Sequence, residues 1–265
     1  MVKVMELTSR LLRGNDGNII FNLIVQTTTT PQTVTITQLT PTGADTTIAW
    51  DDGVVDTIVN GRTSAIDHVY ATAGTYYVRV ARPEIITTLN LQAAPAVGCV
   101  AGNISKLRVL TYLYLHNCAN ITVGADEIGL LVNIVYLYLL DCPNITVGAG
   151  EIGGLVKLTA LFLINCAGIA ATTGMSNTTL IKTIQYKNNL TQAQVDNVLM
   201  AIYDARATYI LTGATPTLDL LGVNNAAPSG VYQAMTPPTT GKEAAYDLVN
   251  DPTSEGFKKW TITTA

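Results

Sequence analysis

The residues best able to do chemistry in this chain are four cysteines and two histidines. Cys118, Cys142 and Cys166 follow one another at intervals of 24 residues. Close thiols can form a disulfide, and thiolates together with imidazoles can hold zinc. The chain has no C-x-x-C pair, and His68 and His116 lie far apart in the sequence. We therefore expect buried free thiols that pack as small apolar groups, and no metal site.

The common signatures of catalysis are missing from the sequence, which contains no G-x-S-x-G, no H-E-x-x-H and no phosphate-binding loop. His68 belongs to a structural motif with Tyr70, so His116 is the one candidate for a free general base. No acid is evident beside it in the sequence. We expect a protein that is not an enzyme and that needs no cofactor.

The elements that position these residues follow from a repeat. The pattern L-x-x-L-x-L-x-x-C-x-x-I starts at Leu110 and recurs from Ile134 and Leu158. Weaker copies begin at Ile86 and Ile181, which makes five rungs. The alternating apolar residues predict one short strand in each copy. Such a strand cannot bury its apolar side alone, whereas strands stacked about 4.8 Å apart form a continuous core.

A second set of apolar columns lies between the predicted strands and should form the opposite wall. Its members are Ile104, Ile128, Ile152, Leu107, Leu131 and Leu155. Together the two patterns resemble the leucine-rich repeat family, whose consensus is L-x-x-L-x-L-x-x-N/C-x-L. The resemblance covers about residues 86–190. It implies a curved solenoid whose parallel strands line a concave binding side, and it places the three repeated cysteines in a structural ladder at the N/C position.

The residues between the inward leucines should point outward on the concave face, because side chains alternate along a strand. These candidate binding residues are Tyr112, Tyr114, His116, Tyr136, Tyr138, Leu140, Phe162 and Ile164. They cover on the order of several hundred Å², a size at which exposed apolar patches usually have a partner. Three interpretations remain open. The rings stack only on one another, they contact a protein such as a second copy or the N-terminal arm, or they bind a glycan, for which flanking carboxylates are lacking.

The N-terminal part carries a different pattern. Asn18–Gln26 and Thr33–Thr40 have the alternation of strands, and W-x-D-G at Trp50 precedes H-x-Y-x-x-x-G-x-Y-x-V at His68. These marks resemble the PKD-type immunoglobulin-like sandwich. The resemblance implies a sandwich over residues 15–84 preceded by an arm, residues 1–14. Trp50 and Tyr70 should be core aromatics. Asp51-Asp52-Gly53 is best interpreted as a turn, since a calcium site needs more carboxylates.

After the rungs, the sequence predicts a capping unit over residues 191–265. Capping boxes at Thr191 and Thr240 each predict the start of a helix. Strands are predicted at Thr217–Val223 and Trp260–Thr263. The fold class is therefore mixed β/α: an immunoglobulin-like sandwich, a leucine-rich repeat solenoid over residues 85–190, and an α/β cap that closes its open end.

The composition narrows the classes of partner. The chain of 265 residues has a net charge of −4 and only 13 % charged residues, which argues against nucleic acid or an anionic membrane surface. No apolar run reaches the roughly 20 residues of a membrane span. The first residues, Met1–Gly14, lack the apolar core of a secretory leader.

The pair of modules resembles proteins of bacterial cell surfaces, particularly of the Bacteroidetes, and of the phages that infect them. The expected function is a non-enzymatic virion component, such as a capsid-decorating, fibre or tail-associated protein. Its partners would be other protein subunits or further copies of itself. The alternative is an extracellular adhesin or glycan-binding module on a cell surface. An accessory domain of an enzyme is a third, weaker hypothesis.

Overall fold

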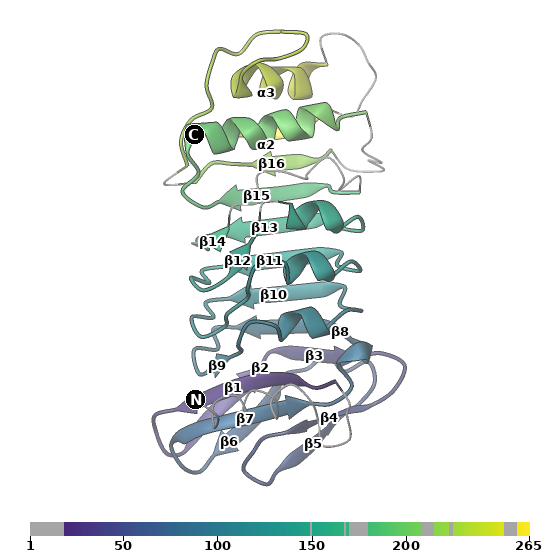
Figure 1. Ribbon diagram of the computed structural model, residues 1–265, viewed down its shortest axis with the longest axis vertical. Coiled ribbons are helices and arrows are strands. Elements are labelled where there is room, and N and C mark those ends of the chain that lie inside the picture. Colours follow the sequence, from purple (N-terminus) through teal and green to yellow (C-terminus); the bar gives the residue numbers. More distant parts are fainter. Residues whose placement is uncertain are drawn as a thin grey trace.

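The computed structural model describes residues 19–148, 150–166, 168–169, 180–207, 215–222, 225–251 and 259–265. Within these ranges the chain is mostly β, with two α-helices. The molecule is elongated: the N-terminal strands form one end, stacked strands form the middle, and the two helices form the other end (Figure 1). The expected arm, residues 1–14, lies outside the described residues.

The middle of the molecule is a parallel sheet in which successive repeats lie side by side. Leu113 pairs with Leu89 on one side and with Leu137 on the other, so equivalent positions are in register. These leucines are fully buried, while the residues between them face outward. The predicted 24-residue register is therefore confirmed. The five strands are β8 (Ile86–Gln92), β10 (Tyr112–His116), β11 (Tyr136–Leu140), β13 (Ala160–Ile164) and β15 (Thr183–Lys187).

The sheet continues beyond the five expected rungs. Two short strands, β16 (Thr217–Asp219) and β17 (Thr261–Thr263), add to it in parallel. The sequence places both segments in a separate cap, but Leu218 pairs with Ile184 and continues the inward column. The strand predicted at Thr217–Val223 ends at Asp219, whose Oδ1 accepts the N–H of Leu221, and Val223 lies outside the described residues.

The other walls of the solenoid consist of 3-10 turns and very short strands. The six isoleucines and leucines predicted for the opposite wall are all fully buried. Burying a side chain of this size contributes about 1.5–3 kcal/mol, so these columns rival the strands as a source of stability. The elements are η2 (Ile104–Lys106), η3 (Ile128–Leu130), η4 (Glu151–Gly154), β9 (Val97–Gly98), β12 (Thr146–Val147) and β14 (Gly168–Ile169).

Two buried glutamates tie the 3-10 turns of neighbouring rungs together. Glu127 and Glu151 are only 6 % and 7 % exposed. Each carboxylate accepts backbone N–H bonds from its own rung and from the preceding one. Glu151 receives them from Asp126 at 2.9 Å, Gly129 at 2.9 Å and Gly148 at 2.6 Å. Polar groups therefore hold this wall together between the apolar columns.

The N-terminal strands close the first rung on two walls. β3 pairs antiparallel with β8 and so joins the solenoid sheet, while β1 pairs antiparallel with β9. A sheet of order β5-β4-β7-β1-β9 and a separate pair β2-β6 make up the rest. The strands are β1 (Phe21–Thr27), β2 (Gln32–Ile36), β3 (Gln38–Pro41), β4 (Thr46–Ala49), β5 (Val55–Ile58), β6 (Ile66–Tyr70) and β7 (Gly74–Val80), and η1 (Pro83–Ile85) leads into β8.

The strand predicted at Thr33–Thr40 is wrong as a single element. The chain divides it into β2 and β3, because Thr35 pairs with Asp67 of β6 whereas Leu39 pairs with Leu89 of β8. The two halves therefore belong to different sheets. β1 begins at Phe21, and the predicted start at Asn18 lies outside the described residues.

The two helices lie beyond the last rungs and begin where the sequence predicts. α2 (Gln192–Asp204) and α3 (Gly241–Asn250) both start with a complete capping box, at Thr191 and Thr240. Each threonine hydroxyl accepts the N–H of the residue three positions on, which satisfies a free donor of the first turn. Residues at helical spacing on α2 are buried: Val195, Val198, Leu199 and Ile202.

Candidate functional site: an aromatic face on the parallel sheet

Three neighbouring strands present the predicted binding residues on one side of the sheet. We call this set the aromatic face: Tyr112, Tyr114, His116, Tyr136, Tyr138, Leu140, Phe162 and Ile164. Tyr136 is the most open, at 43 % exposed, and the others are half-buried. Ala160, the partner of Tyr136 on the next strand, is buried. The structure thus brings all eight predicted residues together.

The rings of this face lie against one another across the strands. Tyr114 and Tyr138 have ring centroids 5.5 Å apart, and Tyr138 stacks on Phe162 at 4.5 Å. Tyr112 lies 6.0 Å from Tyr136. Burial raises the pKa of Tyr112 and Tyr138, so their hydroxyls stay protonated and neutral. The face therefore offers flat apolar surface with hydroxyl donors and no charge of its own at its centre.

His116 at the end of β10 has an acidic partner that the sequence analysis missed. Its Nε2 lies 3.4 Å from Oδ2 of Asp141, and its ring meets the Tyr114 ring edge-on at 6.2 Å. Asn165 donates a hydrogen bond from Nδ2 to Oδ1 of the same aspartate at 2.9 Å. The statement that no acid accompanies His116 is therefore wrong, because the next rung supplies it. The pair contacts the edge of the Tyr114 ring and the Asn165 amide, and it forms a polar rim at the end of the aromatic face.

This rim rests on a ladder of left-handed turns at the ends of the strands. Asn117, Asp141 and Asn165 have φ values of 53°, 52° and 51°. Asn and Asp tolerate this conformation better than most residues. The N–H of Asn117 donates to the carbonyl of Leu140 at 3.0 Å, and the equivalent bond recurs on the next rungs. The signal was present in the sequence, since an Asn or Asp precedes each repeated cysteine.

The cysteine ladder lies inside the solenoid, behind these turns. Cys118, Cys142 and Cys166 are free and buried, and each thiol donates to a backbone carbonyl, for example Cys142 Sγ to Leu140 at 3.1 Å. Cys99 is also free and buried, and burial raises its pKa to about 12. Thiols in this state behave as small apolar groups, which agrees with the prediction for them.

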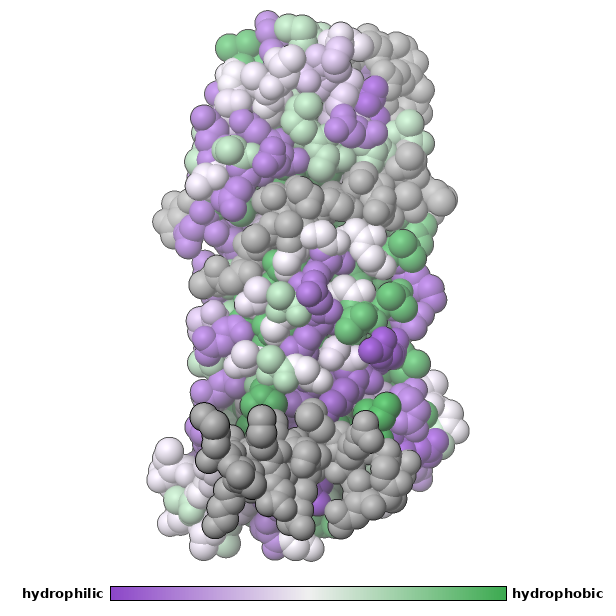
Figure 2. Space-filling model, viewed as in Figure 1, coloured by the Kyte–Doolittle hydropathy of each residue, from purple (hydrophilic) through white to green (hydrophobic). Residues whose placement is uncertain are grey.

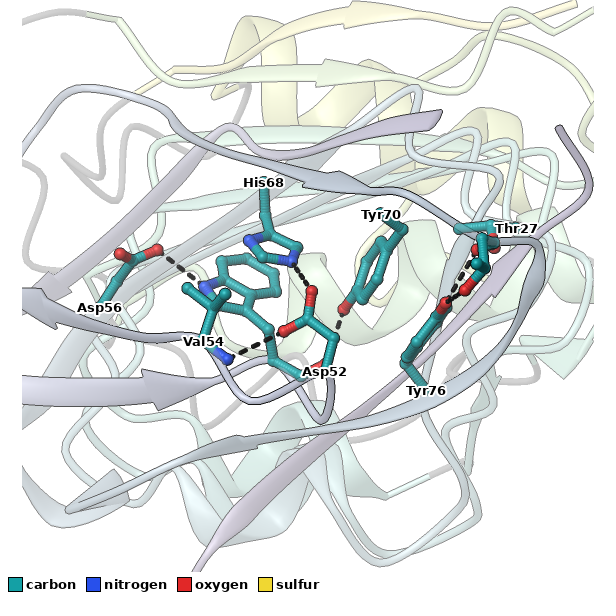
Figure 3. Close-up of polar contacts among 9 residues, drawn as sticks. Thr27, Asp52, Val54, Asp56, His68, Tyr70 and Tyr76 are labelled. Atoms are coloured by element: carbon teal, nitrogen blue, oxygen red, sulfur yellow. Dashed lines mark hydrogen bonds and ion pairs between the residues drawn. The ribbon is translucent and has the colours of Figure 1, made fainter. Parts of the chain in front are cut away.

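His68 lies in a separate aromatic cluster in the N-terminal part (Figure 3). Its ring stacks on Trp50 with centroids 4.4 Å apart, and its Nε2 lies 2.8 Å from Asp52 Oδ2. Trp50 donates from Nε1 to Asp56 at 2.7 Å, and the Tyr70 hydroxyl donates to the Trp50 carbonyl at 3.0 Å. Trp50 and Tyr70 are fully buried, as predicted for core aromatics.

The aspartates of this cluster are engaged by protein donors. Asp51 accepts the N–H of Tyr77 at 2.9 Å, and Asp52 accepts that of Val54 at 3.0 Å. Asp51 and Gly53 have positive φ, which identifies the segment as the predicted turn. Across the part of the chain that the structure describes, no group of three His, Cys, Asp or Glu side chains is placed to hold a metal ion.

The opposite side of the solenoid exposes aliphatic residues in place of rings. Leu130, Val132 and Val156 are 39 %, 48 % and 51 % exposed on or after the 3-10 turns. Apolar residues are interspersed with polar ones along the rungs on the side seen in Figure 2. This aliphatic set is a matched surface against which the aromatic face can be tested.

Among the described helices, none has the length and apolar character needed to cross a membrane. Comparison with known proteins found no matching family model, no similar curated protein and no similar solved structure.

Proposed function

We propose that this chain is a non-enzymatic interaction protein that docks a neighbouring protein subunit onto its aromatic face. The observation that carries the proposal is the set of eight outward side chains on three strands in register, with Tyr136 left 43 % exposed. Tyrosine is favoured at binding hot spots because it combines apolar area with a hydroxyl and few rotatable bonds. Buried leucines on the other side of these strands fix the backbone that carries the rings. Little conformational entropy is therefore lost when a partner binds.

We also propose which kind of module each of the three parts of the chain is. The repeat consensus and the 24-residue register support a leucine-rich repeat solenoid. The W-x-D-G turn with its stacked histidine supports a PKD-like, immunoglobulin-like module at one end. The two capped helices support an α/β cap at the other. This combination favours a component of a phage virion, decorating a capsid or associated with a fibre or tail. An adhesin on a bacterial surface is the alternative.

The docking proposal is tested by site-specific photocrosslinking. Benzoylphenylalanine is placed at Tyr138 in one chain and, as a matched control, at Val132 on the aliphatic side, which is 48 % exposed. Both chains are irradiated in the particles or cells that make them. We expect a discrete protein adduct from position 138 and none from position 132. Adducts absent at position 138, or the same set at both positions, would contradict the proposal.

A further inference from the structure

A small cavity lies where the regular spacing of the left-handed turns along the sheet ends. It has a volume of about 220 Å³ and is lined by Ile164, Asn165, Lys187, Asn189, Leu221, Gly222 and Asn225. Ile164 and Lys187 end β13 and β15, and the other lining residues belong to the segments that follow β13, β15 and β16. The left-handed residue falls directly after the strand in β13 but one residue later, at Asn189, after β15. The repeat shortens from 24 to 23 residues at this point, because Leu161 pairs with Ile184. The cavity lies at this irregular part of the ladder.

The charges at the cavity cancel locally. Lys187 Nζ lies 2.7 Å from Asp219 Oδ2, and both side chains are 27 % exposed. Asp219 also accepts the N–H of Leu221 at 3.0 Å, so the carboxylate is held in place. A site with one paired cation and one paired anion has no strong preference for a charged ligand. The expected ligand is neutral.

The remaining lining is part amide and part hydrocarbon. Asn225 is buried and holds the wall by donating to the carbonyls of Tyr186 and Leu220. Asn189 is exposed at the rim, where its amide can both donate and accept. Ile164 and Leu221 supply the apolar part of the lining. Amphipathic walls of this kind suit a ligand with hydroxyls on its edge and a C–H face.

The cavity also continues the aromatic face. Ile164 belongs to that face and follows Phe162 on the same side of β13, and Phe162 stacks on Tyr138 at 4.5 Å. A chain of rings leaving the cavity would therefore pass over aromatic surface. Asp219 pairs with Lys187 of the cavity lining, and Asp141 pairs with His116 at the end of the aromatic face.

We infer that this cavity binds one neutral sugar ring, the end unit of a glycan whose next unit lies over Phe162. Its volume is below the roughly 300–1,000 Å³ of sites for drug-sized ligands, which suits a single ring. The C–H face of the sugar packs on Ile164 and Leu221, and its hydroxyls bond to Asn189 and the free donors of Lys187. The glycan uses Ile164 and Phe162 at one edge of the aromatic face, whereas the proposed protein contact is centred on Tyr114 and Tyr138.

The test is saturation-transfer NMR of the full chain with free glucose, galactose, mannose and N-acetylglucosamine, followed by a titration of each sugar that gives a signal. Asn189→Gly removes the amide and keeps the backbone conformation, because Asn189 has φ 55°. We expect it to weaken binding of the responding sugar about tenfold, the loss of one good hydrogen bond. Asn117→Gly, at φ 53° in a regular turn, is the matched control and should bind normally.

The outcomes separate this inference from the docking proposal. Tyr114→Ala should leave sugar binding intact while it weakens the protein contact. No response of the wild-type chain to any of the sugars overturns the inference, as does equal binding by Asn189→Gly and wild type. A third outcome is that no sugar binds and that Asn189→Gly abolishes the protein photocrosslink. The cavity would then belong to the protein contact, and the sugar assignment would be wrong.

Discussion

At the scale of single residues, buried polar side chains decide how the rungs are joined. Glu151 holds three backbone N–H groups at 2.6–2.9 Å in a nearly closed environment. Leaving one buried donor unpaired costs about 1–3 kcal/mol, so one carboxylate here outweighs most single apolar contacts.

We expect Glu151→Ala to lower the free energy of unfolding by about 3 kcal/mol, measured by urea denaturation. Glu151→Gln should lose less, because an amide oxygen still accepts. The matched control is Glu84→Ala at an exposed ion pair with Arg82, where about 0–1 kcal/mol is expected. A similar loss for Glu151→Ala and Glu84→Ala would show that the carboxylate clamp contributes little.

The left-handed turns make a second prediction at this scale. Asn117 has φ 53°, a conformation that costs a β-branched residue about 1–2 kcal/mol. Asn117→Val should therefore lower the melting temperature, while Asn117→Gly keeps it. Equal melting temperatures for the two variants would mean that the turn adapts to the side chain.

At the scale of elements, the helix caps carry a pH dependence. Hydrogen bonds from the Thr239 N–H and from the side chains of Gln233, Thr239 and Thr240 lower the pKa of Glu243 to about 2. The carboxyl has a higher pKa in the unfolded chain, about 4.3. Its stabilising effect is therefore full above pH 4.3 and is lost as the pH falls towards 2.

In the wild type the free energy of unfolding should fall between these two pH values. We expect Glu243→Gln to remove part of this fall, as measured by urea denaturation at each pH. Glu84→Gln, at a largely exposed position, serves as the control and should leave the profile unchanged. A Glu243→Gln chain with the wild-type pH profile would contradict the role assigned to this cap.

The repeat itself is testable by removing one unit. Deletion of residues 118–141 takes out 24 residues and joins Asn117 to Cys142, which has the same place in the next rung. We expect a folded chain, shorter by one strand spacing of about 4.8 Å in small-angle scattering. Deletion of residues 118–129, half a unit, breaks the register and should give an unfolded or aggregated product. Two deletions of equal stability would refute the solenoid register.

Local patterns predicted those elements whose signals are local. The alternation around Leu113 set the strand and its buried side, and the capping boxes at Thr191 and Thr240 set the helix starts. Pairings between distant segments were not predicted. Leu39 joins β8 and Leu218 joins β15 through packing of the whole chain, which no short window of sequence contains.

The candidate site, too, was predicted from the sequence only where its signal is local. The eight residues of the aromatic face follow from the register alone. The His116–Asp141 pair and the cavity at Asn189 do not, because they depend on how far each turn advances along the stack. A change of one residue in the repeat length, from 24 to 23, was visible in the sequence, but its consequence for the turns was not.

At the scale of the whole molecule, the N-terminal strands and the solenoid form one structure. β3 covers the edge of β8 and β1 covers β9, so two walls of the first rung depend on them. A chain that begins at Pro83 would expose the β8 edge together with the apolar side of the rung. We expect this truncated chain to aggregate, as seen by light scattering, because open strand edges pair between molecules. A monomeric, folded product would show that the two parts are independent.

The central claim is that the rings of the aromatic face serve a partner and not only one another. The most direct measurement is the affinity of the photocrosslinked partner for the Tyr114→Ala, Tyr138→Ala double variant, taken together with its melting temperature. We predict that affinity falls at least about tenfold, as for hot-spot tyrosines, while the chain stays folded. A lower melting temperature with unchanged affinity would contradict the account and leave ring stacking as the whole role of this face.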